Sequence, residues 1–221
     1  MTQSGYDSSI TGSGWAEGAA LTVQRSRPER VALFSDAVFA VLITILVLEL
    51  KPPAVDTFGA LLTLWPTALS YAVSYLFIAI VWMNHHHLLS YAQATTPRLV
   101  WSNFLHLFAV SLIPFSTEWI ADTQLASAPV TLYALIFVVV NVTCVALCWE
   151  AVDQPSHEAA SARLRRLLRM RSVVTIGVFG ASAVVAVWFP ATAMVLICAC
   201  LVLYLRPDPV RAEGRQAVER A

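Results

Sequence analysis

The chain has 221 residues, of which 58% are hydrophobic and 13% carry a formal charge, with a mean hydropathy of +0.68 and a net charge of zero. Soluble domains contain about 25% charged residues, so this composition excludes an ordinary soluble enzyme or binding domain. We predict an all-α polytopic membrane protein whose surroundings are a lipid bilayer. We expect no nucleic-acid partner.

The two ends of the chain differ from its middle. Residues 1–27 are rich in Ser, Gly and Thr and lack the apolar core of a signal peptide. This composition predicts a disordered cytoplasmic tail. Residues 206–221 are also polar, and we expect a second, short cytoplasmic tail there. The membrane domain is therefore predicted to span residues 28–205.

The first predicted transmembrane helix covers residues 31–50, whose only polar members are Ser35, Asp36, Thr44 and Glu49. At ~1.5 Å per residue, this run is long enough to cross a ~30 Å hydrocarbon core. An ionisable group within such a helix costs at least ~2.5 kcal/mol unless it finds a partner. Asp36 is therefore a candidate functional residue. The alternative is that it lies at the headgroup level and caps the helix.

One stripe of this first helix combines Val41, Thr44 and Leu48, which follow the i, i+3, i+7 spacing. Asp36 lies roughly 140° around the helix from Val41, because successive residues are ~100° apart. The stripe and the acid therefore face different neighbours. Taken alone, such a stripe is also typical of ordinary helix packing.

Five further apolar runs follow, which gives six predicted transmembrane helices. Pro190 separates the last two, which as one helix of about 34 residues would reach ~51 Å and exceed the bilayer. The final run, of about 15 residues, rises only ~22 Å and is the shortest of the six. The five runs cover residues 58–83, 99–116, 129–149, 172–189 and 191–205.

The basic residues predict the topology. If six helices cross the membrane and the N-terminus is cytoplasmic, all but one of the 14 basic residues lie on the cytoplasmic side. The exception is Lys51. This asymmetry follows the positive-inside rule and favours an even number of helices, with both termini in the cytoplasm.

The histidines and cysteines do not form a recognisable site. His85, His86 and His87 are consecutive, so on a helix their side chains point ~100° apart and cannot close on one metal ion. We expect no metal site. The four cysteines, which lack a CxxC pair and have apolar neighbours, are predicted to be free thiols. They are Cys144, Cys148, Cys198 and Cys200.

The first helix begins with the pattern R-x-x-x-F-S-D and continues as AVFAVLITILVLEL. This pattern resembles the first helix of the transmembrane protein 175 family of potassium channels, which occurs in bacteria and in the endolysosomes of animals. The resemblance extends to the second and third helices over residues 30–116. The residues that carry it are Arg30, Phe34, Ser35, Asp36, Trp82, His85, Asn103 and the SLIPF run from Ser111 to Phe115.

The resemblance implies a potassium-permeable channel in the bacterial cell membrane, with one six-helix unit per chain. It further implies a homotetramer, with the first helices around a central pore, no carbonyl filter and no cofactor. The constriction then falls at Val41, Thr44 and Leu48. Val41 departs from the family, which usually has isoleucine or leucine at this position. A smaller side chain there loosens the constriction and bears on potassium selectivity.

The resemblance also implies a polar network that packs the pore helix at its cytoplasmic side and does not coordinate the ion. Asp36 belongs to it, with Arg30 as its predicted counter-charge. The implied network residues are Arg30, Phe34, Ser35, Asp36, His85, Trp101 and Asn103.

Two other classes of function stay open on the residues alone. A proton- or ion-coupled secondary transporter could use Asp36 as its carrier group, but the chain lacks an inverted repeat with paired broken helices. The His triplet and Glu118 suggest an intramembrane enzyme. No nucleophile and base lie at a usable spacing, so we expect no enzymatic activity.

Overall fold

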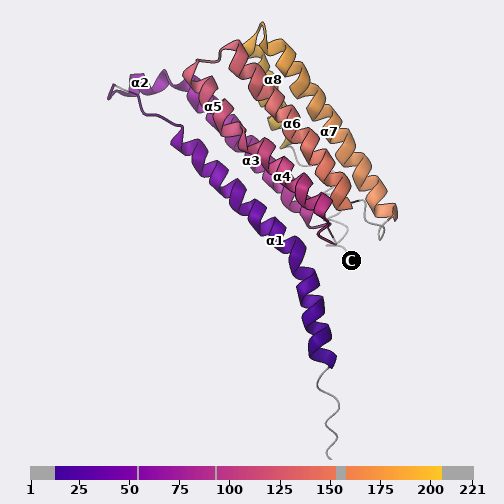
Figure 1. Cartoon of the computed structure of the whole chain (residues 1–221). Helices are drawn as coiled ribbons and strands as arrows, with labels where there is room; N and C mark the ends of the chain where they lie inside the picture. Colours follow the sequence, from indigo (N-terminus) through magenta and orange to yellow (C-terminus); the bar gives the residue numbers. More distant parts are fainter. Residues whose placement is uncertain (1–12, 54, 93, 153–157, 206–221) are drawn as a thin grey trace, which may run out of the picture.

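The structure is a computed structural model that describes residues 13–53, 55–92, 94–152 and 158–205. In these ranges all regular structure is helical, which confirms the predicted fold class, and Figure 1 shows the helices packed as an elongated bundle. The helices are α1 (Ser13–Leu48), α2 (Phe58–Leu62), α3 (Trp65–Leu89), α4 (Pro97–Ser111), α5 (Ile113–Asp122), α6 (Ser127–Val152), α7 (Glu158–Ala186) and α8 (Pro190–Tyr204).

Four helical segments are long and apolar enough to cross a membrane, so the protein is multi-pass. They are Pro28–Leu48, Trp65–Leu89, Pro97–Asp122 and Ser127–Ala151. Two shorter apolar segments, Ser172–Ala186 and Pro190–Tyr204, occupy the places of the fifth and sixth predicted helices. The break between these two falls at Pro190, which is in the first turn of α8. That all six cross the bilayer stays a prediction.

Proline and threonine set several helix starts. Pro66 lies in the first turn of α3, which explains why this helix begins at Trp65. The helix ends at Leu89, so both of its ends come later than those of the predicted helix 58–83. The residues before it form the separate short helix α2. Thr96 caps α4, with its Oγ1 accepting from the Leu99 N–H at 3.1 Å. The connection between α3 and α4 is therefore shorter than the interval 84–98 between the second and third predicted helices.

Three aromatic rings join the middle helices of the bundle. Phe77 of α3 stacks on Phe137 of α6 with ring centroids 3.6 Å apart, and Phe179 of α7 meets both rings edge-on. Nearby, the Ser74 hydroxyl lies 2.7 Å from the hydroxyls of Thr117 and Tyr133, all buried. These three hydroxyls satisfy one another, and the buried apolar side chains of α3, α5, α6 and α7 belong to one continuous core.

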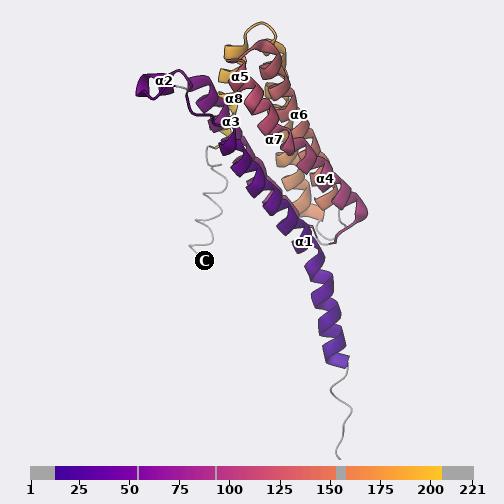
Figure 2. The ribbon, with the colours of Figure 1, turned by 60° about the vertical axis from the view of Figure 1, so that its left-hand side comes forward.

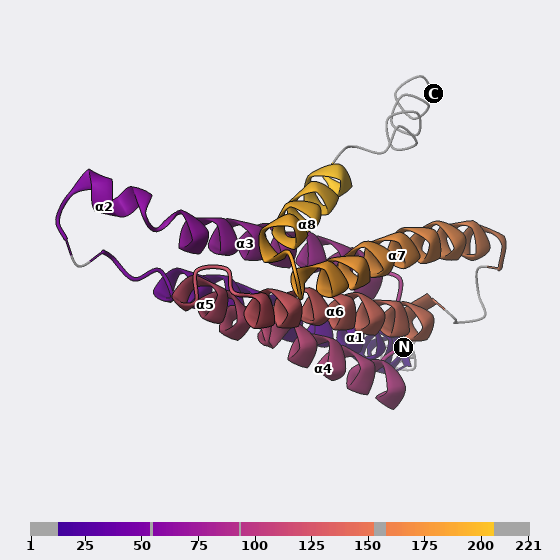
Figure 3. The ribbon, with the colours of Figure 1, turned by 90° about the horizontal axis from the view of Figure 1, so that it is seen from above.

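The first helix is placed differently from the others. α1 and α7 lie on opposite sides of the bundle in Figure 1, and in the view from above in Figure 3 α1 is partly covered by α4 and α6. The N-terminal part of α1 extends beyond the other helices in Figures 1 and 2. Residues 13–27, which the composition assigns to a disordered tail, are helical here as part of α1. Residues 1–12 and the predicted tail 206–221 lie outside the described residues.

Candidate functional site

The packed face of α1 is narrow. Its fully buried side chains are Ser35, Phe39, Leu42 and Leu46, at the spacing i, i+4, i+7, i+11 that marks a single face of a helix. This face packs chiefly on α3, with smaller contacts on α4 and α5. Only 22% of the most apolar 18-residue window of α1 is buried, against 44–50% in the other three segments that can span the membrane. Most of α1 is therefore not covered by its own subunit.

The predicted stripe lies on the uncovered side of α1. Val41 is 55% exposed, Leu48 is 77% exposed, and Thr44 between them is also exposed. At ~100° per residue, the stripe points about 155° away from the centre of the buried face. The Thr44 hydroxyl donates to the Val41 carbonyl at 2.7 Å, which leaves the lone pairs of its oxygen on the exposed side.

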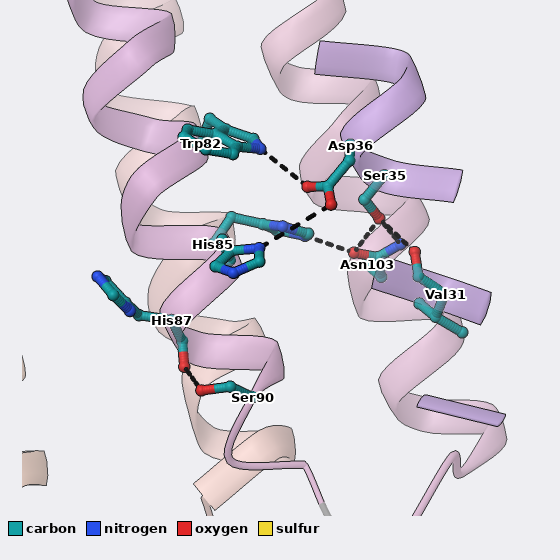
Figure 4. Close-up of polar contacts among 9 residues, drawn as sticks. Val31, Ser35, Asp36, Trp82, His85, His87, Ser90 and Asn103 are labelled. Carbon is teal, nitrogen blue, oxygen red and sulfur yellow. Dashed lines mark hydrogen bonds and ion pairs between the residues drawn. The ribbon is translucent and has the colours of Figure 1, made fainter. Parts of the chain in front are cut away.

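A directional chain of hydrogen bonds links α3, α4 and α1 (Figure 4). His85 Nε2 lies 2.7 Å from Asn103 Oδ1, and because an amide oxygen only accepts, the imidazole donates. Asn103 Nδ2 donates to Ser35 Oγ at 3.0 Å, and the Ser35 hydroxyl donates to the Val31 carbonyl at 2.9 Å. The three side chains are buried. This chain therefore fixes the register between α1 and the rest of the subunit.

Asp36 is held beside this chain by different partners. The Trp82 Nε1–H donates to Asp36 Oδ1 at 2.8 Å, as Figure 4 shows. His86 Nδ1 lies 3.9 Å from Asp36 Oδ2. Trp82 and His86 are four residues apart on α3 and so share a face. Arg30, the predicted counter-charge, is exposed, and the ion pairs among the described residues do not join it to Asp36.

The structure joins three of the seven predicted network residues, Ser35, His85 and Asn103, by hydrogen bonds to one another. Asp36 lies beside them but binds Trp82, and the remaining three residues are outside the hydrogen-bonded chain. The ring of Phe34 meets the ring of Phe104 of α4 edge-on, with centroids 5.6 Å apart. The Phe104 ring also lies 6.3 Å from the Trp101 ring. Phe34 and Trp101 are both exposed in the single subunit.

Sequence reasoning missed a second layer behind His85. The His85 and His106 rings stack almost parallel, 5.6 Å apart. His106 Nδ1 lies 3.0 Å from Thr143 Oγ1, whose hydroxyl already donates to backbone carbonyls of α6, so the imidazole is the donor. The signal in the sequence is the spacing of Asn103 and His106, which places both on one face of a helix.

The His triplet diverges as its spacing predicts. His85 is buried whereas His86 and His87 are exposed, and Figure 4 shows the His87 side chain pointing away from His85. Among the described residues there is no group of three or more His, Cys, Asp or Glu side chains able to hold a metal ion. The four cysteines form no disulfide bond within the described part of the chain, which agrees with their prediction as thiols.

A charged cluster lies at the C-terminal end of the α1 span. Lys51 Nζ is 3.0 Å from Glu118 Oε1 and 3.8 Å from Asp122 Oδ1, both on α5. The hydrogen bond to Glu118, together with the charge of Asp122, raises the pKa of Lys51. Loss of hydration and the neighbouring Glu118 carboxylate raise the pKa of Glu49. The cluster therefore joins the segment after α1 to α5.

This arrangement defines a helical, multi-pass membrane protein with one sparsely covered helix. Residues 30–114 match the family described as the endosomal/lysosomal potassium channel TMEM175. A potassium channel of Streptomyces collinus is 34% identical over 151 residues, 62% of this chain and 73% of that protein. A potassium channel of Chryseobacterium sp. is 40% identical over 106 residues, 48% of this chain but only 55% of that protein. The chain belongs to the TMEM175 family of potassium channels.

Solved structures agree with this assignment. A crystal structure of a lysosomal potassium-selective channel TMEM175 homologue from Chamaesiphon minutus is 28% identical, with a TM-score of 0.68 over 82% of this chain and 100% of that one. A variant of the potassium channel MtTMEM175 is 16% identical, with a TM-score of 0.58 over 87% and 94% of the two chains. The second likeness shows the fold alone.

Proposed function

We propose that the chain forms a potassium-permeable channel in which the stripe of Val41, Thr44 and Leu48 on α1 lines the narrow part of the pore. The observation that carries this proposal is the exposure of that stripe on the face of α1 opposite its buried residues. A membrane helix that turns this side away from its own subunit needs another neighbour. A water-filled pathway and further copies of α1 are the neighbours that the family resemblance implies.

The assembly in this proposal is a homotetramer in the cell membrane, with both termini in the cytoplasm and no cofactor. Four copies of α1 surround the central axis, and the domain limits stay at 28–205. The hydrogen-bonded chain from His85 through Asn103 to Ser35 supports this arrangement, because it fixes the rotation of α1 and so which stripe faces inward. Arg30, Phe34 and Trp101 are exposed in one subunit, and in the proposed tetramer a neighbouring subunit contacts them.

The mechanism that we propose needs no carbonyl filter. A narrow ring of apolar side chains excludes water, so an ion that enters must lose part of its hydration shell. Potassium sheds water at lower cost than sodium, which favours its passage. The lone pairs of the Thr44 oxygens replace part of the lost water. Valine at position 41 makes that ring wider than isoleucine or leucine would.

The experiment that tests the pore lining uses single cysteines in a variant without the four native cysteines. Cysteine at positions 41, 44 and 48 should react with a small water-soluble thiol reagent and lose potassium current, because these positions face the pathway. Cysteine in place of Leu46, which is fully buried against the subunit, is the matched control and should not react. Equal reaction at Leu46 and Leu48 would reject the assignment.

A further inference from the structure

Hydrophobic packing holds α1 only up to a point short of its end. The last buried side chain of the helix is Leu46, whereas Val47, Leu48 and Leu50 are exposed. Leu48 is the predicted pore residue nearest this end. Burial in the subunit therefore stops two residues before Leu48, at the end of the helix, and a contact further along the chain adds a second constraint on its position.

Lys51 supplies such a contact three residues later. Its Nζ lies 3.0 Å from Glu118 Oε1 and 3.8 Å from Asp122 Oδ1. Three residues span at most ~10 Å, so the place of Lys51 limits where Leu48 can be. Pro52 and Pro53 follow directly, and a residue before proline is restricted to extended conformations. Lys51 therefore has little freedom to move away from α5 without moving the end of α1.

The partner helix is firmly anchored. In α5, Ile113, Thr117 and Ile120 are buried, and the Thr117 hydroxyl joins the Ser74 cluster of the core. The ion pair thus connects the least buried membrane segment to a helix that cannot shift without disturbing the core. An exposed ion pair adds little to folding stability, so its effect is expected on position.

We propose that Lys51, paired with Glu118 and Asp122, is a positioning residue that holds the C-terminal end of α1 on α5 and thereby sets the width of the pore at Leu48. This inference rests on the proposed pore. Releasing the pair lets the end of α1 shift, which changes the ring of Leu48 side chains. Selectivity then falls, because the dehydration that an ion must undergo depends on the width of that ring.

The test measures single-channel conductance and the potassium-to-sodium permeability ratio of Lys51→Gln, Glu118→Gln and the exchange Lys51→Glu with Glu118→Lys. Both single variants should shift the ratio toward unity, in the same direction, and the exchange should restore most of it. The double variant Lys51→Gln with Glu118→Gln should add little to either single change, because both remove one interaction. Asp56→Asn is the matched control, since Asp56 is an exposed carboxylate of the same connecting segment outside the pair.

A simpler role for these charges gives a different result. If they only attract cations toward the pore, removal of Lys51 raises current and removal of Glu118 lowers it, with a strong dependence on salt. Opposite signs, additive effects or unchanged ratios would each overturn the proposal. A size-exclusion profile like that of the unmodified protein shows that each variant is folded. If cysteine at position 48 reacts as expected while the variants behave as wild type, only the positioning role fails. If it does not react, the pore proposal fails first.

Discussion

At the scale of single residues, Asp36 illustrates how an acid is accommodated in an apolar helix. Its carboxylate accepts from the Trp82 indole at 2.8 Å and has His86 at 3.9 Å, and its side chain is 33% exposed. The donor reaches it from α3, so the acid joins two helices. We interpret Asp36 as a structural acceptor.

Asp36→Ala should therefore reduce the folded yield and the oligomer peak together with the current. The loss of a hydrogen bond to a charged group costs about 1.5 kcal/mol, the lower end of the usual range, because this site is partly exposed. Size-exclusion chromatography of the detergent-extracted protein, run beside an ion-flux assay, checks this. Asp36→Asn keeps an acceptor for the indole and is the control. A normal oligomer peak with abolished proton-coupled transport would instead support a transporter that uses Asp36 as its carrier.

The sequence predicted some of these residue contacts and missed others, for a physical reason. The family resemblance implied Ser35, His85 and Asn103, and their contact agrees with the rule that buried polar groups find partners. Trp82 and His86 were not identified as the partners of Asp36, since the i, i+4 spacing shows only that they share a face. The face of α3 that meets α1 is set by packing between helices, and residue spacing within α3 carries no information about that packing.

At the scale of helices, α1 divides its length between two kinds of contact. One face packs on its own subunit through Phe39, Leu42 and Leu46, whereas the stripe that ends at Leu48 is exposed. The consequence for mutagenesis is that conductance and stability respond to different positions.

Leu48→Ala should raise the conductance and lower the potassium-to-sodium permeability ratio, because it removes an apolar side chain from the narrow ring. The change in unfolding free energy should stay within about 0.5 kcal/mol, as expected for an exposed position. Bilayer recordings and thermal unfolding in detergent measure the two effects. Val47→Ala is the control, because Val47 is exposed but lies about 90° from the stripe. Unaltered current and ratio in Leu48→Ala would count against the constriction.

The residues at a helix start predicted its position at Pro190 but not at Pro66. Pro190 was recognised as a break because proline cannot continue a preceding helix. The start of α3 was placed too early, since residues 58–64 are apolar enough to extend the run, and hydropathy does not register the first-turn preference of Pro66. Sequence patterns therefore predicted the order of the apolar segments better than their ends.

At the scale of the whole molecule, the positions of the connections constrain the topology. Lys51 and the segment 123–126 lie at the same end of the bundle, since the Lys51–Glu118 pair joins the end of α1 to α5. Ser90, which follows α3, and Thr96, which precedes α4, lie at the other end. A membrane protein with this arrangement exposes these segments on opposite sides.

Epitope tags inserted after Asp56 and after Gln124 should be labelled from outside intact cells, whereas a tag after Tyr91 should need permeabilised cells. The expectation follows from the distribution of basic residues, which favours a cytoplasmic N-terminus. A tag at the C-terminus should also be protected. Labelling of the C-terminal tag in intact cells would mean that α7 and α8 do not both cross the membrane.

The sparse burial of α1 also links the folding of the subunit to its association. A helix with few native contacts has a low free energy of local opening, so it is the segment expected to exchange amide protons fastest in an isolated subunit. Neighbouring subunits would supply the burial that its own chain does not provide. Stability would then depend on protein concentration, and we expect dilution in detergent to release α1 before the core around Phe77 unfolds.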